Sequence, residues 1–200
     1  MSYRSNGNGP FALILGGSFE AGLGIWLCHA GIENVKAFEH YGVAPTSGYL
    51  MSLFGAAIVV LGLATIVYGA HLNRKEKALQ AAITDMTNAS GAVSPREFLK
   101  HKGAFLKDGD YTGVYVIHNV SKDMYYVGQS VRVIGRVTQH FTGHGNGDVY
   151  ADYKYGDTFT INTIALSGSG YNSLDALERD AIQTYHAFDR GYNRTRGNRN

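Results

Sequence analysis

The C-terminal half of the chain carries side chains whose types suit chemistry on a phosphate ester. An arginine can hold a phosphate through two parallel hydrogen bonds, a histidine can accept or relay a proton, and a carboxylate can bind a divalent cation. Tyrosine hydroxyls can position water or a phosphate oxygen. The candidates, which include one glycine and one asparagine, are Tyr115, Tyr126, Gly128, Arg136, His140, Glu178 and Asn193.

Glu178 is the most informative of these residues on internal grounds. A helix is expected from Ser173 to about His186, because Ser173 can cap it and Asp175 suits its first turn. Glu178 then lies beside the apolar stripe, and no residue three or four positions away on the helix is a cation. A carboxylate in that place suits a divalent-metal ligand. A solvated glutamate, or one paired across the fold, is the structural alternative.

Arg136 and His140 are four residues apart in a segment, 131–141, whose apolar residues have helical spacing. They therefore project from one flank of the expected helix and can act on the same group. A solvated polar face is the alternative for this pair. Packing between strands is the alternative for Tyr115 and Tyr126.

The elements that must position these residues form a small mixed domain. Residues 111–117 and 125–127 are rich in β-branched and aromatic residues and predict an antiparallel hairpin around a turn. Alternation predicts a third strand at 158–166. Residues 143–148 and 167–172 are expected to be loops. Residues 111–200 are therefore expected to form an α/β domain, with a three-stranded antiparallel sheet flanked by helices.

Taken together, these motifs resemble the GIY-YIG nuclease superfamily over residues 112–196. Gly113-Val114-Tyr115 and Tyr126-Val127-Gly128 are similar to the two motifs that name the family, with valine in place of isoleucine. Tyr126 follows Tyr115 by 11 positions, Arg136 follows Gly128 by 8, and Asn193 follows Glu178 by 15. The resemblance is specific because several independent spacings agree.

The resemblance implies a divalent-metal-dependent endonuclease that hydrolyses DNA phosphodiester bonds, with RNA left open as a substrate. Glu178 would ligate one Mg²⁺ or Mn²⁺ ion, and Arg136 would bind the scissile phosphate. Tyr115 would help to activate the attacking water, as a general base or within a relay. Because an unperturbed tyrosine has a pKa of about 10, Tyr115 needs the metal or a neighbour to act at pH 7.

The resemblance also implies supporting roles for the remaining positions. Tyr126 and His140 would position the water and the phosphate. Asn193 would support the site by hydrogen bonding. Gly128 would keep the strand end clear, so that the backbone can approach the substrate.

The N-terminal half predicts a membrane segment. Residues 48–70 contain no charged residue, and a helix of this length, at about 1.5 Å per residue, can cross a hydrocarbon core of roughly 30 Å. Residues 11–32 are also mostly apolar but include Glu20 and His29. A signal peptide is the alternative for this first segment. We favour a helical hairpin over residues 11–71, with close helix approach at small residues, namely Gly16, Gly17, Gly24, Gly55, Ala56 and Gly62.

The flanks of the hairpin predict its orientation and connection. Arg74, Lys75 and Lys77 follow the second apolar run, and the positive-inside rule then places the C-terminal domain in the cytoplasm. Residues 1–10 are expected to be disordered. Residues 72–110 are expected to be a helical stalk or linker, with one helix to about residue 87 and another capped by Ser94.

Composition narrows the function classes. The formal net charge is only +2, so strong non-specific attraction to nucleic acid is not expected. The lone Cys28 excludes a disulfide framework and is expected to be a small buried hydrophobe.

Two functions compete with the endonuclease. The charge of residues 111–200 is only +1, which favours a catalytically inactive membrane-anchored protein that binds or tethers nucleic acid. A transport or channel hairpin would use Glu20 and His29, but it leaves the C-terminal half unexplained. The full set of catalytic positions favours the endonuclease. With no further DNA-reading module, weak sequence preference is expected.

Overall fold

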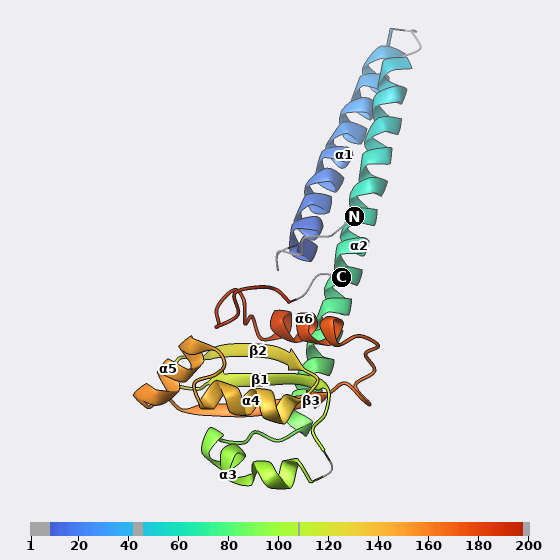
Figure 1. Cartoon of the computed structure of the whole chain (residues 1–200). Coiled ribbons are helices and arrows are strands. Elements are labelled where there is room, and N and C mark those ends of the chain that lie inside the picture. The colour runs from blue at the N-terminus through green and yellow to red at the C-terminus, as the bar shows by residue number, and fades with distance from the viewer. Residues whose placement is uncertain (1–8, 42–45, 108, 198–200) are drawn as a thin grey trace. The chain divides into compact units, whose positions relative to one another are not determined.

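The computed structural model describes residues 9–41, 46–107 and 109–197, and the chain forms two compact units, residues 1–77 and 78–200. The elements are shown in Figure 1. Their bounds are α1 (Gly9–Glu39), α2 (Thr46–Ala89), α3 (Pro95–Phe105), β1 (Gly113–Asn119), β2 (Met124–Ser130), α4 (Val133–Phe141), α5 (Gly147–Tyr155), β3 (Phe159–Ala165) and α6 (Leu174–Thr184). The mixed α/β class is confirmed. Of the segment expected to be disordered, residues 1–8 lie outside the described residues, and Gly9 and Pro10 begin α1.

Helices α1 and α2 pack antiparallel through glycines that recur every seventh residue. A Cβ at Gly24 would lie 2.6 Å from the carbonyl oxygen of Gly55, and one at Gly17 would lie 2.5 Å from that of Gly62. The third pair is Gly31 and Gly48, where the corresponding distance is 2.8 Å. Backbones can approach this closely only where no side chain separates them.

The structure shows which of the expected small residues lie in the interface between the two helices. Gly17, Gly24, Gly55 and Gly62 lie in the interface, whereas a Cβ at Gly16 would meet open space. Ala56 is exposed rather than interfacial.

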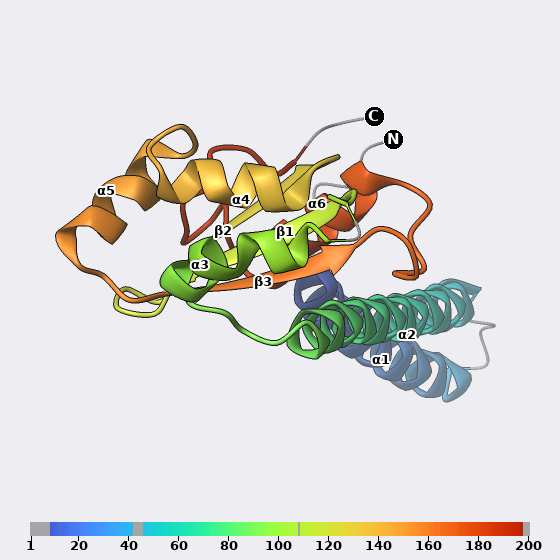
Figure 2. The same ribbon diagram turned by 60° about the horizontal axis from the view of Figure 1, so that its bottom comes forward.

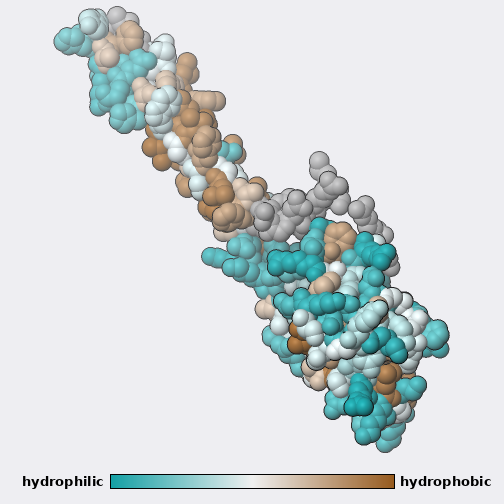
Figure 3. Space-filling model, turned by 90° about the vertical axis from the view of Figure 1, so that its left-hand side faces the viewer, coloured by the Kyte–Doolittle hydropathy of each residue, from teal (hydrophilic) through white to brown (hydrophobic). Residues whose placement is uncertain are grey.

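The two helices are long and apolar enough to cross a membrane. Figure 3 shows hydrophobic residues along the surface of this hairpin. Helix α1 continues beyond Ile32 to Glu39, where a polar connection was expected. An ion pair between Glu33 and Lys36, 2.9 Å apart on one helix face, is compatible with this extension. The Cys28 thiol is only partly buried and donates to the carbonyl oxygen of Ser52 at 3.3 Å.

The sheet of the second unit has the order β2-β1-β3, with both pairs antiparallel. Alternating residues of β1 enter two different cores. Tyr115 and Ile117 pack with residues of α3, α4 and α5, whereas Val114 and Val116 pack with residues of α2 and α6. Helices α4 and α6 therefore cover opposite faces of the sheet (Figures 1 and 2).

Residues 78–105 belong to the second unit, which corrects the expectation of a stalk reaching residue 110. Ile83 is fully buried in the core beside α6, and Phe98 is buried in the core beside α4. Val93 forms an antiparallel bridge with Ile161 of β3. The cap expected at Ser94 is confirmed, and Glu97 completes a capping box with it. The segment is part of the domain because these apolar side chains are buried in its two cores.

Candidate active site

Tyr115 and Gly128 are direct partners across strands β1 and β2. Tyr115 is 1% exposed and belongs to the core beside α4. A Cβ on Gly128 would overlap the hydroxyl and the ring of Tyr115. The sequence interpretation assigned the clearance at Gly128 to the approach of substrate. The structure shows that the tyrosine fills this space.

The rings of Tyr115, Tyr126 and His140 form a cluster. The centroid of Tyr115 lies 6.1 Å from that of Tyr126 and 5.3 Å from that of His140, and the last two lie 4.9 Å apart. The hydroxyl oxygen of Tyr115 is 2.9 Å from Nε2 of His140. Paired strands supply both tyrosines and α4 supplies the histidine, so residues far apart in sequence meet on one face of the sheet.

Hydrogen bonding determines which nitrogen of His140 carries its proton. The backbone N–H of Asn146 donates to Nδ1 at 2.8 Å, so Nδ1 is an acceptor. Burial, and then the nearby charge of Arg136, lower the pKa of His140 to about 4. The imidazole is therefore neutral at pH 7, with its proton on Nε2. It donates to the oxygen of Tyr115, which leaves the hydroxyl proton of Tyr115 for another acceptor.

Tyr115 is a phenol at neutral pH. Burial raises its pKa far above 10, Tyr126 raises it further, and the Arg136 guanidinium opposes the shift only in part. A buried phenol of this kind suits hydrogen-bond donation to a phosphate oxygen or a water molecule. It does not suit proton abstraction without help from a further charge.

Arg136 lies one turn before His140 on α4 and is partly exposed. Its Nη1 donates to Oε1 of Gln139 at 2.7 Å. None of the ion pairs among the described residues involves Arg136. Its charge is therefore not neutralised by a carboxylate, and the guanidinium can bind a phosphate beside the ring cluster.

Asn193 binds the outer strand of the sheet. Its Oδ1 accepts from the backbone N–H of Val127 at 2.9 Å, and its Nδ2 donates to the carbonyl oxygen of the same residue at 2.7 Å. Val127 lies between Tyr126 and Gly128 on the edge strand β2. The side chain thus pairs with an edge strand as a neighbouring strand would, and it fixes the backbone that carries two of the candidate residues.

Glu178 approaches β2 from the face covered by α6. Nε2 of Gln129 donates to the Glu178 carboxylate at 3.0 Å, and Gln129 also donates to the Asp175 carboxylate. Burial is the main cause that raises the pKa of Glu178, and the hydrogen bond from Gln129 opposes it. The negative charge of Asp175 raises the pKa further. Glu178 is thus a half-buried carboxylate, as its helical position predicts, paired across the fold with a neutral amide.

The donor set at Glu178 fits a Mg²⁺ ion held by few protein ligands. Among the described residues, no group of three or more histidine, cysteine or acidic side chains is arranged to hold a metal. Mg²⁺ commonly keeps several waters and takes one or two carboxylates plus phosphate oxygens. Glu178 and Asp175, brought together by Gln129, supply carboxylates of this kind. A cation there would stabilise the ionised form of Glu178, which burial disfavours.

Two consecutive residues of β2 contact the ring cluster and Glu178, which lie on opposite faces of the sheet. Gly128 accommodates Tyr115 on the α4 face, and Gln129 holds Glu178 on the α6 face. The structure therefore groups Tyr115, Tyr126, Arg136 and His140 directly. It places Glu178 across the edge strand from them.

A residue that the sequence interpretation missed positions the start of α4. The carboxylate of Asp110 accepts from the backbone N–H groups of Ile134 and Gly135, each at 2.9 Å. Arg132, at the N-cap position of α4, makes no side-chain cap. Asp110 thus accepts hydrogen bonds from backbone N–H groups at the N-terminal end of α4, the helix that carries Arg136. An acidic residue so distant in sequence gives no capping signal, because capping patterns are local.

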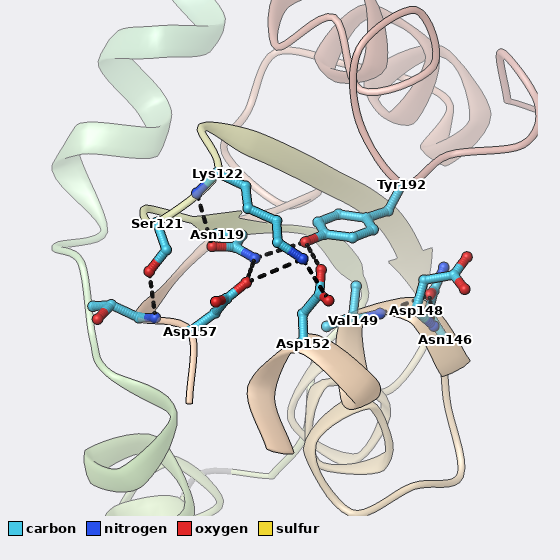
Figure 4. Close-up of polar contacts among 10 residues, drawn as sticks. Asn119, Ser121, Lys122, Asn146, Asp148, Val149, Asp152, Asp157 and Tyr192 are labelled. Carbon is cyan, nitrogen blue, oxygen red and sulfur yellow. Dashed lines mark hydrogen bonds and ion pairs between the residues drawn. The ribbon is translucent and has the colours of Figure 1, made fainter. Parts of the chain in front are cut away.

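A second polar cluster holds the segment that leads to Asn193 (Figure 4). The hydroxyl of Tyr192 donates to Asp152 at 2.6 Å and accepts from the fully buried Asn119 at 2.7 Å. Lys122 forms ion pairs with Asp152 at 2.6 Å and with Asp157 at 3.4 Å. Both carboxylates are thus paired with the same lysine within the cluster. Its contribution is to connect α5, the β1–β2 turn and the C-terminal segment.

Comparison with known protein families, with curated proteins and with solved structures found no match to this chain.

Proposed function

We propose that the protein is a membrane-anchored, divalent-metal-dependent endonuclease of the GIY-YIG type that hydrolyses DNA phosphodiester bonds on the cytoplasmic side. The observation that carries the proposal is the cluster of Tyr115, Tyr126 and His140, with an unneutralised Arg136 on the same helix as the histidine. The carboxylate of Glu178 lies across the same edge strand, held by Gln129. This combination supplies a phosphate-binding cation, fixed hydroxyl donors and a metal-binding carboxylate.

The arrangement supports a different role for each side chain around the phosphate. Arg136 binds the scissile phosphate and stabilises the negative charge that develops on it. Tyr115 donates its proton to a phosphate oxygen or to the attacking water, and His140 fixes the direction of that donation. Tyr126 borders the same space. A divalent ion at Glu178 and Asp175 would supply Lewis-acid stabilisation of the leaving oxygen.

The membrane and cytoplasmic parts of the proposal rest on the first unit. Helices α1 and α2 have the length and composition to span a bilayer. Arg74, Lys75 and Lys77 come directly after the long apolar run of α2. Basic residues at this end of a membrane helix favour a cytoplasmic position for the C-terminal unit.

Cleavage of plasmid DNA, linear duplex, single-stranded DNA and RNA by the full chain in detergent micelles tests this function. We expect cleavage with Mg²⁺ or Mn²⁺ and none in EDTA. Arg136→Ala should lower the rate by about 100- to 1,000-fold, as for other lost transition-state donors. Arg190→Ala removes an exposed arginine from the same unit and should cleave at the wild-type rate.

Binding without turnover is the second candidate function, and one observation favours it. Burial keeps Tyr115 protonated and lowers the basicity of His140, so neither side chain of the ring cluster is a strong base at neutral pH. Salt-sensitive DNA binding by a folded chain that cleaves none of the four substrates would establish a tethering protein in place of the enzyme.

A further inference from the structure

An open cleft lies beside the candidate active site, at the end of the sheet where β1 begins and β3 ends. Its volume is about 680 Å³. Residues just before β1 and in the loop that joins β3 to α6 line it, among them Tyr111, Ser167, Gly168, Gly170, Tyr171 and Asn172. None of the lining residues carries a formal charge, and none belongs to the candidate active site. The cleft therefore offers a neutral surface with polar edges, and its lining supplies no charged side chain for a phosphate or a metal ion.

Hydrogen bonds from their hydroxyl groups hold the two tyrosines of this cleft in place. The hydroxyl of Tyr111 donates to Oγ1 of Thr163 at 2.6 Å, and that of Tyr171 donates to Asp180 at 2.9 Å. Both residues are partly buried. Each side chain is thus fixed before any ligand arrives, Tyr111 against the core beside α4 and Tyr171 against the core beside α6. This lowers the entropic cost of placing a planar group against them.

The loop between β3 and α6 is also held in place. The backbone N–H of Leu166 donates to the carbonyl oxygen of Thr112 at 2.9 Å, and the hydroxyl of Ser169 donates to the carbonyl oxygen of Leu166 at 2.8 Å. Gly168 and Gly170 have φ of 81° and 79°, and a Cβ at either would meet open space. Their backbone conformation favours glycine. The absence of side chains there leaves room for a ligand close to the loop backbone.

An exposed cation lies next to the neutral cleft. The backbone N–H of Val133 donates to the carbonyl oxygen of Tyr111 at 3.0 Å, so the preceding residue, Arg132, is adjacent to one wall. Arg132 is exposed and takes part in no ion pair within the described part of the chain. Arg136 follows four residues later, about 6 Å along α4. Phosphates can therefore be held at both arginines by one strand that passes the cleft.

We propose that this cleft binds an unpaired base of a nucleic-acid strand, stacked against Tyr171 and Tyr111, while Arg132 holds a neighbouring phosphate. The inference deepens the proposed nuclease function and rests on it, because it assigns single-stranded or locally unpaired nucleic acid as the substrate class. Base stacking on tyrosine tolerates any base sequence, so the site would give little sequence preference.

Fluorescence anisotropy with the full chain in detergent micelles and EDTA tests the proposal. The probes are a short labelled oligothymidylate, its RNA counterpart, and strands with one abasic site placed at each position in turn. Wild type should bind at least one abasic strand about 5- to 100-fold more weakly than the intact strand. Tyr171→Ala should weaken binding of the intact strand by a similar factor and remove its advantage over the abasic strands.

Two further variants distinguish the loss of base stacking from a general loss of protein stability. Tyr171→Phe keeps the ring, loses the bond to Asp180, and should bind within about threefold of wild type. Tyr155→Ala removes a tyrosine that is 89% exposed on α5 and should leave binding unchanged. A 2-aminopurine placed at the sensitive position should lose fluorescence on binding to wild type and regain it on binding to Tyr171→Ala.

The outcomes distinguish the cleft from the nuclease. Equal binding of intact and abasic strands by wild type, or wild-type affinity in Tyr171→Ala, would overturn the base site. The proposed nuclease function would stand in that case, provided that DNA is still bound through Arg136. If the folded wild-type chain bound no strand even at low salt, the proposed function would be overturned together with the base site.

Discussion

The hydroxyl oxygen of Tyr115 and Nε2 of His140 lie 2.9 Å apart, and the histidine is the donor of this hydrogen bond. The direction follows from Asn146, whose backbone N–H occupies the other ring nitrogen. As a result, this bond does not use the proton of the phenol, which is left for a different acceptor. For the proposed nuclease, this relationship favours positioning and charge stabilisation as the role of Tyr115, over the role of general base that the family resemblance implies.

The neutral state of His140 predicts how the stability of the domain depends on pH. Burial and Arg136 lower the pKa of His140 from 6.5 to about 4, so the unfolded chain binds a proton that the folded domain does not bind between these values. The stabilisation is fully present above a pH of about 6.5 and is lost as the pH falls through about 4. Its size is on the order of 3 kcal/mol. Urea unfolding at a series of pH values measures it.

His140→Gln provides the comparison, because glutamine can donate and accept like the neutral imidazole but does not ionise. Between pH 7 and pH 4, the free energy of unfolding of this variant should fall by about 3 kcal/mol less than that of wild type. His144→Gln, at an exposed position nearby, should retain the wild-type dependence. Equal pH dependence in His140→Gln and wild type would contradict the neutral, buried histidine.

Gly128→Ala should disrupt the site through Tyr115. The added Cβ overlaps the hydroxyl and the ring of Tyr115, so the ring must move and the hydrogen bond to His140 must lengthen. We expect a loss of about 1–3 kcal/mol in unfolding free energy and the loss of cleavage. Gly147→Ala, where a Cβ meets open space, should unfold and cleave like wild type. If Gly128→Ala matched Gly147→Ala in thermal unfolding, the close packing would be refuted.

Asn193→Ala should loosen the edge strand locally. It leaves the N–H and the C=O of Val127 without their side-chain partners, at a cost of about 1–3 kcal/mol. Hydrogen exchange at the amide of Val127 should become faster, and Asn88→Ala, at an exposed position on α2, should not change it. An unchanged exchange rate in a folded Asn193→Ala chain would show that this side chain does not support β2.

The hairpin of α1 and α2 should be sensitive to single methyl groups on one face only. Gly24→Ala places a Cβ 2.6 Å from the carbonyl oxygen of Gly55, whereas Gly22→Ala places one in open space. Alanine favours helix at both positions, so any difference reports packing. Thermal unfolding in detergent should show Gly24→Ala less stable than Gly22→Ala by about 1–3 kcal/mol. Equal stability would contradict the paired glycines.

The elements that carry strong local patterns could be predicted from the sequence. Alternation indicates β3, apolar spacing indicates α4, and Ser94 with Glu97 predicts the start of α3. Helix α5 was not predicted, because its Asn146 cap falls within a glycine-rich stretch that is typical of a loop. The packing of Ile83 and Phe98 into the domain was also missed, since contacts with distant strands leave no local pattern.

Within the site, helical spacing predicted that Arg136 and His140 lie on one flank, but it did not predict how the site residues interact. Arg136 and His140 share a flank because helical periodicity places them there. The acceptor role of Nδ1 in His140 and the pairing of Glu178 with Gln129 depend on backbone and side-chain positions that are set by the whole fold. Asp110, which caps α4 from beyond the hairpin, belongs to the same class of long-range contacts.

The most direct test of the account is plasmid nicking by the full chain in Mg²⁺, with Glu178→Gln and Asp85→Asn measured in parallel. Asp85→Asn removes an exposed carboxylate from the same unit and serves as the matched control. We expect Glu178→Gln to lower the nicking rate by at least about 100-fold and Asp85→Asn to nick like wild type. Nicking by Glu178→Gln at the wild-type rate would contradict Glu178 as the metal ligand. The absence of nicking by a folded wild-type chain would contradict the enzyme itself.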